Sequence, residues 1–219
     1  MIPLKDDNPT RSFSWVTLAL VVLNSVVFAY EISLGSSTER LVLSYGAIPF
    51  DMFHSETGNA RIYVAGSIFT AMFLHGGFLH LAGNMLYLWI FGNNIEDIMG
   101  HRRFIVFYLL CGIVAAYAHA YTNITSHVPM IGASGAVAGV LGAYLILFPR
   151  ARILTLLPIG IFIQIVKIPA LIVLGFWFVI QFFNGLFAPQ QAGGVAWFAH
   201  IGGFLAGIVL LPFFKKRGG

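Results

Sequence analysis

The chain has 219 residues, of which 58% are hydrophobic and 9% charged, whereas a typical soluble domain has roughly 25% charged residues. With a mean hydropathy of +0.87, this composition excludes an ordinary soluble domain and indicates a polytopic membrane protein. The net charge of +4 does not indicate a nucleic-acid partner, because the basic residues lie in short connections between apolar segments. A single cysteine, Cys111, excludes an intramolecular disulfide.

Six apolar segments are of the kind that form transmembrane helices, which need about 20 residues to cross the hydrocarbon core. We expect these helices at residues 15–33, 80–98, 104–121, 134–148, 169–187 and 195–214. The sequence therefore predicts an all-α fold class, in which six transmembrane helices form one membrane domain over residues 15–214.

The longest connection, about residues 34–66, is too mixed in composition to cross a membrane. We expect either a loop seated in the membrane, whose apolar pieces form short interfacial helices, or an ordinary surface loop. Residues 67–74 are expected to lead the chain back into the membrane. Residues 150–167, which Pro158 and Gly160 interrupt, are expected to form an interfacial connection.

The basic residues indicate the orientation of the chain. Ten of the twelve lie near the termini or in connections on one side of the expected bundle: Lys5, Arg11, Arg102, Arg103, Arg150, Arg152, Lys167, Lys215, Lys216 and Arg217. By the positive-inside rule this side is cytoplasmic. Residues 1–14 lack the h-region and cleavage site of a signal peptide. We therefore expect them to be a short cytoplasmic tail, and residues 215–219 a basic cytoplasmic tail.

Ser134 opens the fourth apolar segment and is a candidate nucleophile. A serine hydroxyl attacks only when a base accepts its proton and donors stabilise the resulting oxyanion. The expected topology places Ser134, His80 and His200 at one depth near the outer face. A serine in a membrane helix can also serve only close helix packing, which is the alternative here.

Candidate donors and a candidate base lie in two other segments. His80 and Asn84 are four residues apart, so their side chains share one face of a helix. His200 lies near the start of the last segment. Polar groups at membrane depth are costly, which makes each of them a candidate functional residue. Hydrogen bonding between helices is the alternative for each.

Glycines favour a close approach of the last and the fourth helix. Gly203 and Gly207 share the helical face of His200, and Gly135 and Gly139 lie on one flank of the fourth segment. None of the eight carboxylates can be placed behind the histidine from the sequence. We therefore expect a serine–histidine dyad without an acid, with the ring oriented by packing or by an aromatic side chain.

The sequence resembles the rhomboid family of intramembrane serine proteases over nearly its whole length. Three motifs carry the resemblance: HxxxxHxxxN at residues 75–84, GASG at residues 132–135 and AHIGGFLAG at residues 199–207. The resemblance implies a rhomboid-like six-helix bundle with a water-filled cavity open to the outer side. It implies cleavage of transmembrane segments of membrane proteins near their outer end. We expect contact with membrane lipid, and neither a nucleic-acid partner nor a cofactor or metal.

Carried over by position, the resemblance implies roles for single residues. Ser134 is implied to be the nucleophile and His200 the general base. The oxyanion hole is implied to consist of His80, Asn84 and the backbone N–H of Ser134. The helix at residues 169–187 and the loop after it are implied to form a lateral gate, and the long loop after the first helix corresponds to the membrane-seated loop of the family.

Two positions depart from the family pattern. Many members carry Trp-Arg before the histidine motif, whereas Tyr63 to Ser67 contain neither residue. Some members stack a tyrosine on the histidine from the position that Ala138 occupies here, so what orients His200 is open. Without further helices or a soluble domain, the chain resembles the compact prokaryotic form, which we expect in a bacterial or archaeal cytoplasmic membrane.

Three alternatives stand beside this interpretation. A zinc site could use His75, His80 and His200 as ligands, but the chain has no HExxH motif. A non-catalytic rhomboid-like protein that escorts membrane proteins usually lacks the serine or the histidine, and this chain has both. A transporter or channel is favoured only by the polar groups at membrane depth.

Overall fold

The computed structural model describes residues 1–55, 58–160, 162–187 and 195–216. Its helices are α1 (Trp15–Ser33), the 3-10 helix η1 (Gly35–Ser37), α2 (Thr38–Tyr45), α3 (Pro49–His54), α4 (Gly58–Ala71), α5 (Phe78–Met99), α6 (His101–Thr122), α7 (Ser134–Leu147), α8 (Ala170–Phe187) and α9 (Trp197–Phe214). Its strands are β1 (Ile2–Asp6), β2 (Arg152–Ile159) and β3 (Phe162–Pro169). All six helices expected from apolar segments are confirmed as helices, as α1, α5, α6, α7, α8 and α9.

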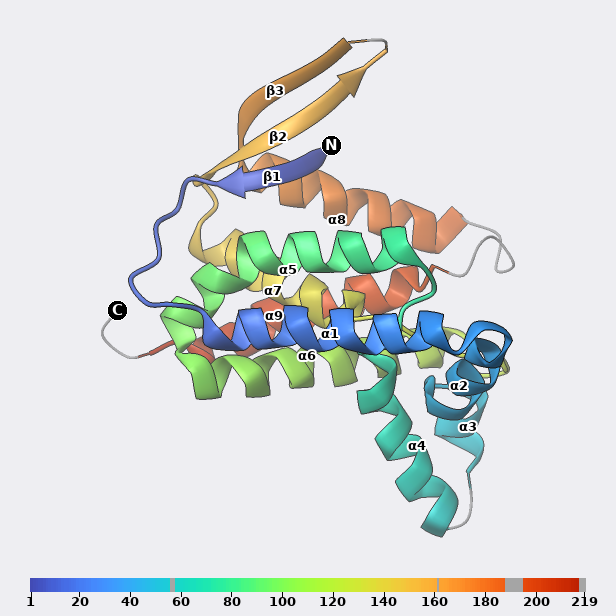
Figure 1. Ribbon diagram of the computed structural model, residues 1–219. Coiled ribbons are helices and arrows are strands. Elements are labelled where there is room, and N and C mark those ends of the chain that lie inside the picture. The colour runs from blue at the N-terminus through green and yellow to red at the C-terminus, as the bar shows by residue number, and fades with distance from the viewer. Residues whose placement is uncertain (56–57, 161, 188–194, 217–219) are drawn as a thin grey trace.

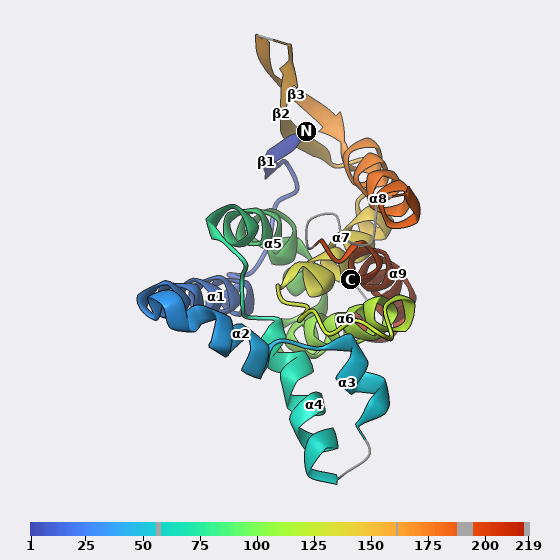
Figure 2. The ribbon, with the colours of Figure 1, turned by 90° about the vertical axis from the view of Figure 1, so that its right-hand side faces the viewer.

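The short helix α7 lies at the centre of the bundle and packs against α5, α6, α8 and α9 (Figures 1 and 2). All residues from Gly135 to Tyr144 are buried. Before the helix, Gly132 has a φ of 121°, a conformation that favours glycine, and after it Pro149 prevents continuation. With 14 residues the helix is about 21 Å long, whereas the hydrocarbon core is roughly 30 Å thick. It is therefore too short to cross that core with both ends in water.

In the described part of the chain, α1, α6, α8 and α9 are long and apolar enough to cross a membrane. The apolar helix α7 is shorter. The last turns of α5 contain Asn93, Asn94, Glu96 and Asp97, which lower its hydropathy. The chain is thus a mostly helical integral membrane protein, and the count of six spans stays a prediction.

The expected all-α fold class is wrong in one respect, because β1, β2 and β3 form an antiparallel sheet in that order. The register of β2 and β3 runs from Arg152 opposite Pro169 to Ile159 opposite Phe162, and this hairpin projects from the bundle (Figure 1). Its residues were expected in an interfacial connection and those of β1 in a tail. A short run of Ile, Leu and Val suits both a β-strand and an interfacial segment, so the hydrophobic pattern does not distinguish these two structures.

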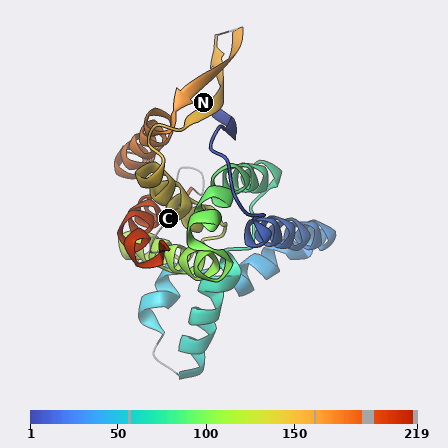
Figure 3. The ribbon, with the colours of Figure 1, turned by 90° about the vertical axis from the view of Figure 1, so that its left-hand side faces the viewer.

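The long connection after α1 folds into short helices. The expectation of short helices here is met by α2 and α3; their seating in a membrane stays a prediction. The boundary expected near residue 66 is wrong, because α4 runs unbroken from Gly58 to Ala71. Gly66 is tolerated in its middle. This helix points away from the bundle on the side opposite to the β2–β3 hairpin (Figures 2 and 3).

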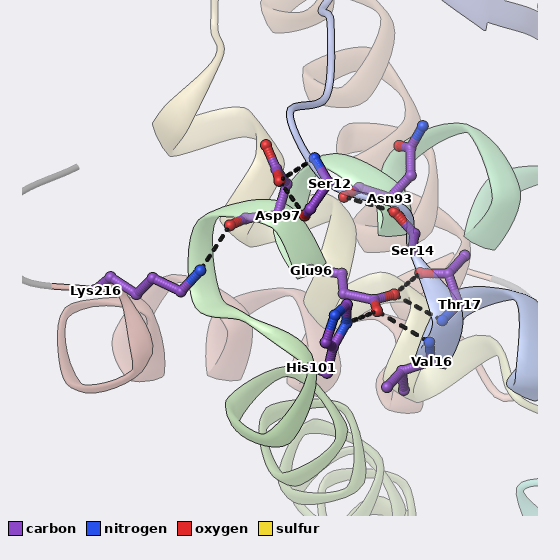
Figure 4. A network of polar contacts seen from close by, with 9 residues as sticks. All are labelled: Ser12, Ser14, Val16, Thr17, Asn93, Glu96, Asp97, His101 and Lys216. Atoms are coloured by element: carbon purple, nitrogen blue, oxygen red, sulfur yellow. Dashed lines mark hydrogen bonds and ion pairs between the residues drawn. The ribbon is translucent and has the colours of Figure 1, made fainter.

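A buried carboxylate holds the beginning of α1 (Figure 4). Glu96, near the end of α5, is 1% exposed. It accepts hydrogen bonds from the backbone N–H groups of Val16 at 2.9 Å and Thr17 at 2.7 Å, and from the Thr17 hydroxyl at 2.7 Å. It also pairs with the His101 ring at 2.5 Å. Since Ser14, at the N-cap position of α1, makes no capping hydrogen bond, Glu96 satisfies N–H groups that a helix leaves unpaired at its start.

The neighbouring Asp97 ties segments near both termini to α5. Its carboxylate accepts hydrogen bonds from the backbone N–H groups of Arg11 and Ser12, each at 2.9 Å, and from the Ser12 hydroxyl. The Lys216 ammonium donates to the Asp97 carbonyl oxygen at 3.3 Å (Figure 4). The chain before α1 and the chain after α9 therefore meet at the end of α5.

Asp6, the last residue of β1, reaches between α5 and α7. Its Oδ2 accepts hydrogen bonds from the Tyr144 hydroxyl at 2.7 Å and from the Asn94 side-chain amide at 2.8 Å. Burial raises the pKa of this carboxyl above its ordinary value. Tyr144 lies in the last turn of α7, so the sheet is attached to the end of α7 that lies opposite Ser134.

We expect Glu96→Ala to lower the free energy of unfolding by about 2 kcal/mol, because buried donors of α1 lose their acceptor. Glu96→Gln keeps one acceptor oxygen and should lose less. Thermal unfolding of the purified protein in detergent micelles measures both variants, and Glu39→Ala, at an exposed carboxylate, is the control. Equal stability of Glu96→Ala and wild type would contradict the capping role.

Candidate active site

Ser134 is the first residue of α7, and His200 lies in the first turn of α9. The Ser134 Oγ is 2.9 Å from Nε2 of His200, although the residues are 66 positions apart in the sequence. At this distance the hydroxyl can donate to the ring and pass its proton to it. The structure thus brings together the two residues proposed from the sequence as nucleophile and base.

Glycines let α7 and α9 approach closely enough for this contact. A Cβ atom on Gly203 would lie 2.0 Å from the carbonyl oxygen of Gly135, and one on Gly207 would lie 1.9 Å from that of Gly139. No side chain fits at such distances, so the two helices touch through their backbones. The glycine faces that the sequence spacing predicted are the faces that meet.

Three side chains surround the His200 ring. The Gln181 Oε1 lies 2.7 Å from Nδ1, on the side of the ring away from Ser134. The Trp177 ring lies at a centroid distance of 5.8 Å and the Trp197 ring at 6.2 Å, edge-on to the histidine. The expectation that aromatic packing would help to orient the ring agrees with this arrangement.

Gln181 was missed in the sequence. It lies on α8, where its side chain is buried with 6% exposure. One signal could have indicated it, since a polar residue in an apolar transmembrane segment is a candidate functional residue. Its spacing of four from Trp177 also places both on one helical face.

His80 and Asn84, both on α5, meet beside the backbone that precedes Ser134. A Cβ atom on Gly132 would lie 2.8 Å from the His80 Nε2 and 3.7 Å from the Asn84 Nδ2. The backbone N–H of Gly76 donates to the other ring nitrogen of His80 at 3.4 Å. The Asn84 Nδ2 is buried and has no hydrogen-bond partner among the described residues. Two polar nitrogens therefore converge on the space next to Ser134.

The geometry gives no support to the zinc alternative. The His75 ring lies edge-on to the His80 ring, with the two ring centroids 5.2 Å apart. The backbone N–H of His75 donates to the Glu31 carboxylate at 3.2 Å. Both ring nitrogens of His200 already have partners. Within the described ranges, no three His, Cys, Asp or Glu residues are grouped so that they could hold a metal ion.

A small cavity adjoins Ser134. Its volume is about 20 Å³, which gives room for about one water molecule. The wall consists mainly of small residues, including Ala115, Gly135 and Ala199. Space for a water molecule therefore exists next to the hydroxyl.

The fold and the site define an integral membrane protein in which a serine at the start of a buried central helix contacts a histidine of a neighbouring helix. Comparison with known sequences defines the family. The model of the Rhomboid domain matches residues 64–217, which is more than half of the chain. The chain belongs to the rhomboid family.

Several curated relatives are similar to most of the chain. It is 32% identical over 203 residues to Rhomboid protease GluP of Bacillus subtilis (strain 168), covering 93% of this chain and 36% of the relative. It is 30% identical over 164 residues to the mitochondrial Rhomboid protein 1 of Saccharomyces cerevisiae, covering 72% and 43%. It is 33% identical over 143 residues to RHOMBOID-like protein 5 of Arabidopsis thaliana, covering 65% and 42%. The chain thus spans less than half the length of each of these relatives.

We expect Gly207→Ala to destabilise the protein by about 2 kcal/mol or more, because the new methyl group must push α9 away from the Gly139 carbonyl oxygen. Gly175→Ala on α8 is the matched control, since a Cβ atom there meets no atom within 4 Å. Thermal unfolding in detergent micelles compares the two. If both variants unfold like wild type, the backbone contact of α7 and α9 does not hold the bundle together.

Proposed function

We propose that the chain is a rhomboid-type intramembrane serine endopeptidase with a catalytic dyad of Ser134 and His200. The observation that carries this proposal is the 2.9 Å contact between the hydroxyl and the ring nitrogen at the start of α7. The similarity over 93% of the chain to a relative named as a rhomboid protease supports it.

In the proposed reaction, His200 Nε2 accepts the hydroxyl proton while Ser134 Oγ attacks the carbonyl carbon of a peptide bond. The tetrahedral intermediate collapses when His200 gives this proton to the leaving amine, and an acyl-enzyme remains. A water molecule then loses a proton to His200 and attacks the ester. When the second tetrahedral intermediate collapses, His200 returns this proton to Ser134 Oγ, which regenerates the hydroxyl and releases a carboxylic acid that ionises in water.

The proposed oxyanion hole consists of the His80 ring, the Asn84 amide and the backbone N–H of Ser134. The Asn84 Nδ2 has no partner within the described ranges, and a buried donor without a partner is costly in a resting protein. It gains an acceptor when negative charge develops on a substrate oxygen beside Gly132. The N–H of Ser134 has no acceptor within its own helix, because it belongs to the first turn of α7.

The proposed substrates are transmembrane segments of other membrane proteins, which would reach Ser134 sideways past α8. The distribution of basic residues supports an orientation with both termini in the cytoplasm and Ser134 toward the outer face. Cleavage would then occur near the outer face. We place the protein in a bacterial or archaeal cytoplasmic membrane, with α1, α5, α6, α8, α9 and the shorter α7 as the six helices of its membrane domain.

The proposed dyad is tested with a fluorophosphonate probe for activated serines, in detergent and in bilayers. Wild type should be labelled, whereas Ser134→Ala and His200→Ala should not, because one lacks the nucleophile and the other its base. Circular dichroism and unfolding temperature establish that the variants are folded. Labelling of Ser134→Ala at the wild-type level would overturn the proposal. A folded wild type that neither reacts with the probe nor cleaves transmembrane substrates would favour a binding protein.

The proposed oxyanion hole is tested by Asn84→Ala, which should reduce kcat for a transmembrane substrate by about 10²-fold, since one donor to the oxyanion is lost. Asn24→Ala is the control, because Asn24 is a buried asparagine of α1 whose amide donates to Leu20 in its own helix. Its kcat should match wild type once the folded fraction is taken into account. An equal loss in both variants would show that Asn84 acts only through stability.

A further inference from the structure

Gln181 contacts His200 at the ring nitrogen that Ser134 does not use. Its Oε1 lies 2.7 Å from Nδ1, and the side chain is 6% exposed. In α8, other buried positions are Ala170, Val173 and Leu174, all near its beginning. A buried amide in such a helix is costly unless it is hydrogen-bonded. Its partner here is the proposed catalytic base.

The contact between Gln181 and His200 distinguishes the two neutral tautomers of the ring. A neutral imidazole carries its proton on one nitrogen and accepts with the other. To accept the Ser134 proton, Nε2 must be free, so the ring proton must lie on Nδ1. The oxygen of Gln181 can only accept a hydrogen bond, and it therefore stabilises the form of His200 that has Nδ1–H.

In the described part of the chain, no carboxylate contacts Nδ1 of His200. Among the hydrogen bonds of the described residues, those of the His200 ring go to Gln181 and Ser134. In serine hydrolases with a complete triad, a carboxylate holds the tautomer and supports the imidazolium that forms. A neutral amide oxygen can hold the tautomer as a carboxylate does. It can support the imidazolium only through the dipole of the amide group.

We propose that Gln181 is the positioning residue of His200: it holds the Nδ1–H tautomer through its amide oxygen and so keeps Nε2 available to Ser134. This inference rests on the proposed function of the dyad. Trp177 lies one helical turn earlier on α8, and its ring centroid is 5.8 Å from that of the His200 ring. One face of α8 therefore sets both the tautomer and the plane of the base.

The tautomer is measured directly by ¹⁵N NMR of the full chain with labelled histidines in detergent micelles, with the His200 signals identified by their loss in His200→Ala. Wild type should show a protonated Nδ1. Gln181→Met, of similar length but without an acceptor, should shift His200 toward the Nε2–H form. Gln181→Glu keeps an acceptor oxygen and should keep the Nδ1–H form. An Nε2–H ring in wild type, or no change in Gln181→Met, overturns the proposal.

Kinetics give the second measurement. Gln181→Met should lower kcat about tenfold with KM unchanged, because one hydrogen bond to the base is lost, and Gln181→Glu should restore most of it. The matched control is Asn184→Leu on the same helix, which should change neither the tautomer nor kcat. A loss of kcat without a change of tautomer would overturn the positioning role. The NMR result does not depend on activity, so a failure of the proposed protease function remains distinguishable from a failure of this inference.

Discussion

The backbone contact between α7 and α9 is the constraint on which the rest of the site depends. In a membrane, helices gain little from hiding apolar side chains, so close packing of small residues has to hold them together. Gly203 against Gly135 and Gly207 against Gly139 provide this packing at two points that lie about one helical turn apart. A short serine side chain reaches a ring on the neighbouring helix only because the two backbones are in contact.

Polar contacts hold both ends of α7 in position, and the residues between these ends are buried. At one end Ser134 meets His200. At the other end Tyr144 donates to Asp6 of β1, which also accepts from Asn94 of α5. The helix is too short to place both ends in water, so these contacts satisfy groups that lipid could not. The sheet and the N-terminal segment thereby help to fix the helix that begins with Ser134.

The sequence was sufficient to predict the helices and the proximity of Ser134 to His200. Long apolar runs indicate spans by length alone, and regular spacing put His80 with Asn84, and His200 with Gly203, on common faces. The pairing of β2 with β3 was not predictable, because its apolar residues give no period that separates strand from interfacial segment. The role of Gln181 depends on the rotation of α8 about its axis. Packing against α9 decides that rotation, and an almost uniformly apolar helix does not reveal it.

The position of Gln181 also connects the proposed lateral entry of substrates past α8 with the chemistry of the proposed base. Beyond Leu174, the buried residue of α8 is Gln181, while Phe182, Phe183 and Phe187 are exposed. This half of α8 is thus held to the bundle mainly through the face that touches His200. A displacement of α8 away from α9 would separate the amide oxygen from Nδ1 before it disturbed the glycine contacts of α7 and α9. The proposed orientation of His200 therefore depends on the position of α8, whereas Ser134 lies on α7, which is buried from Gly135 to Tyr144.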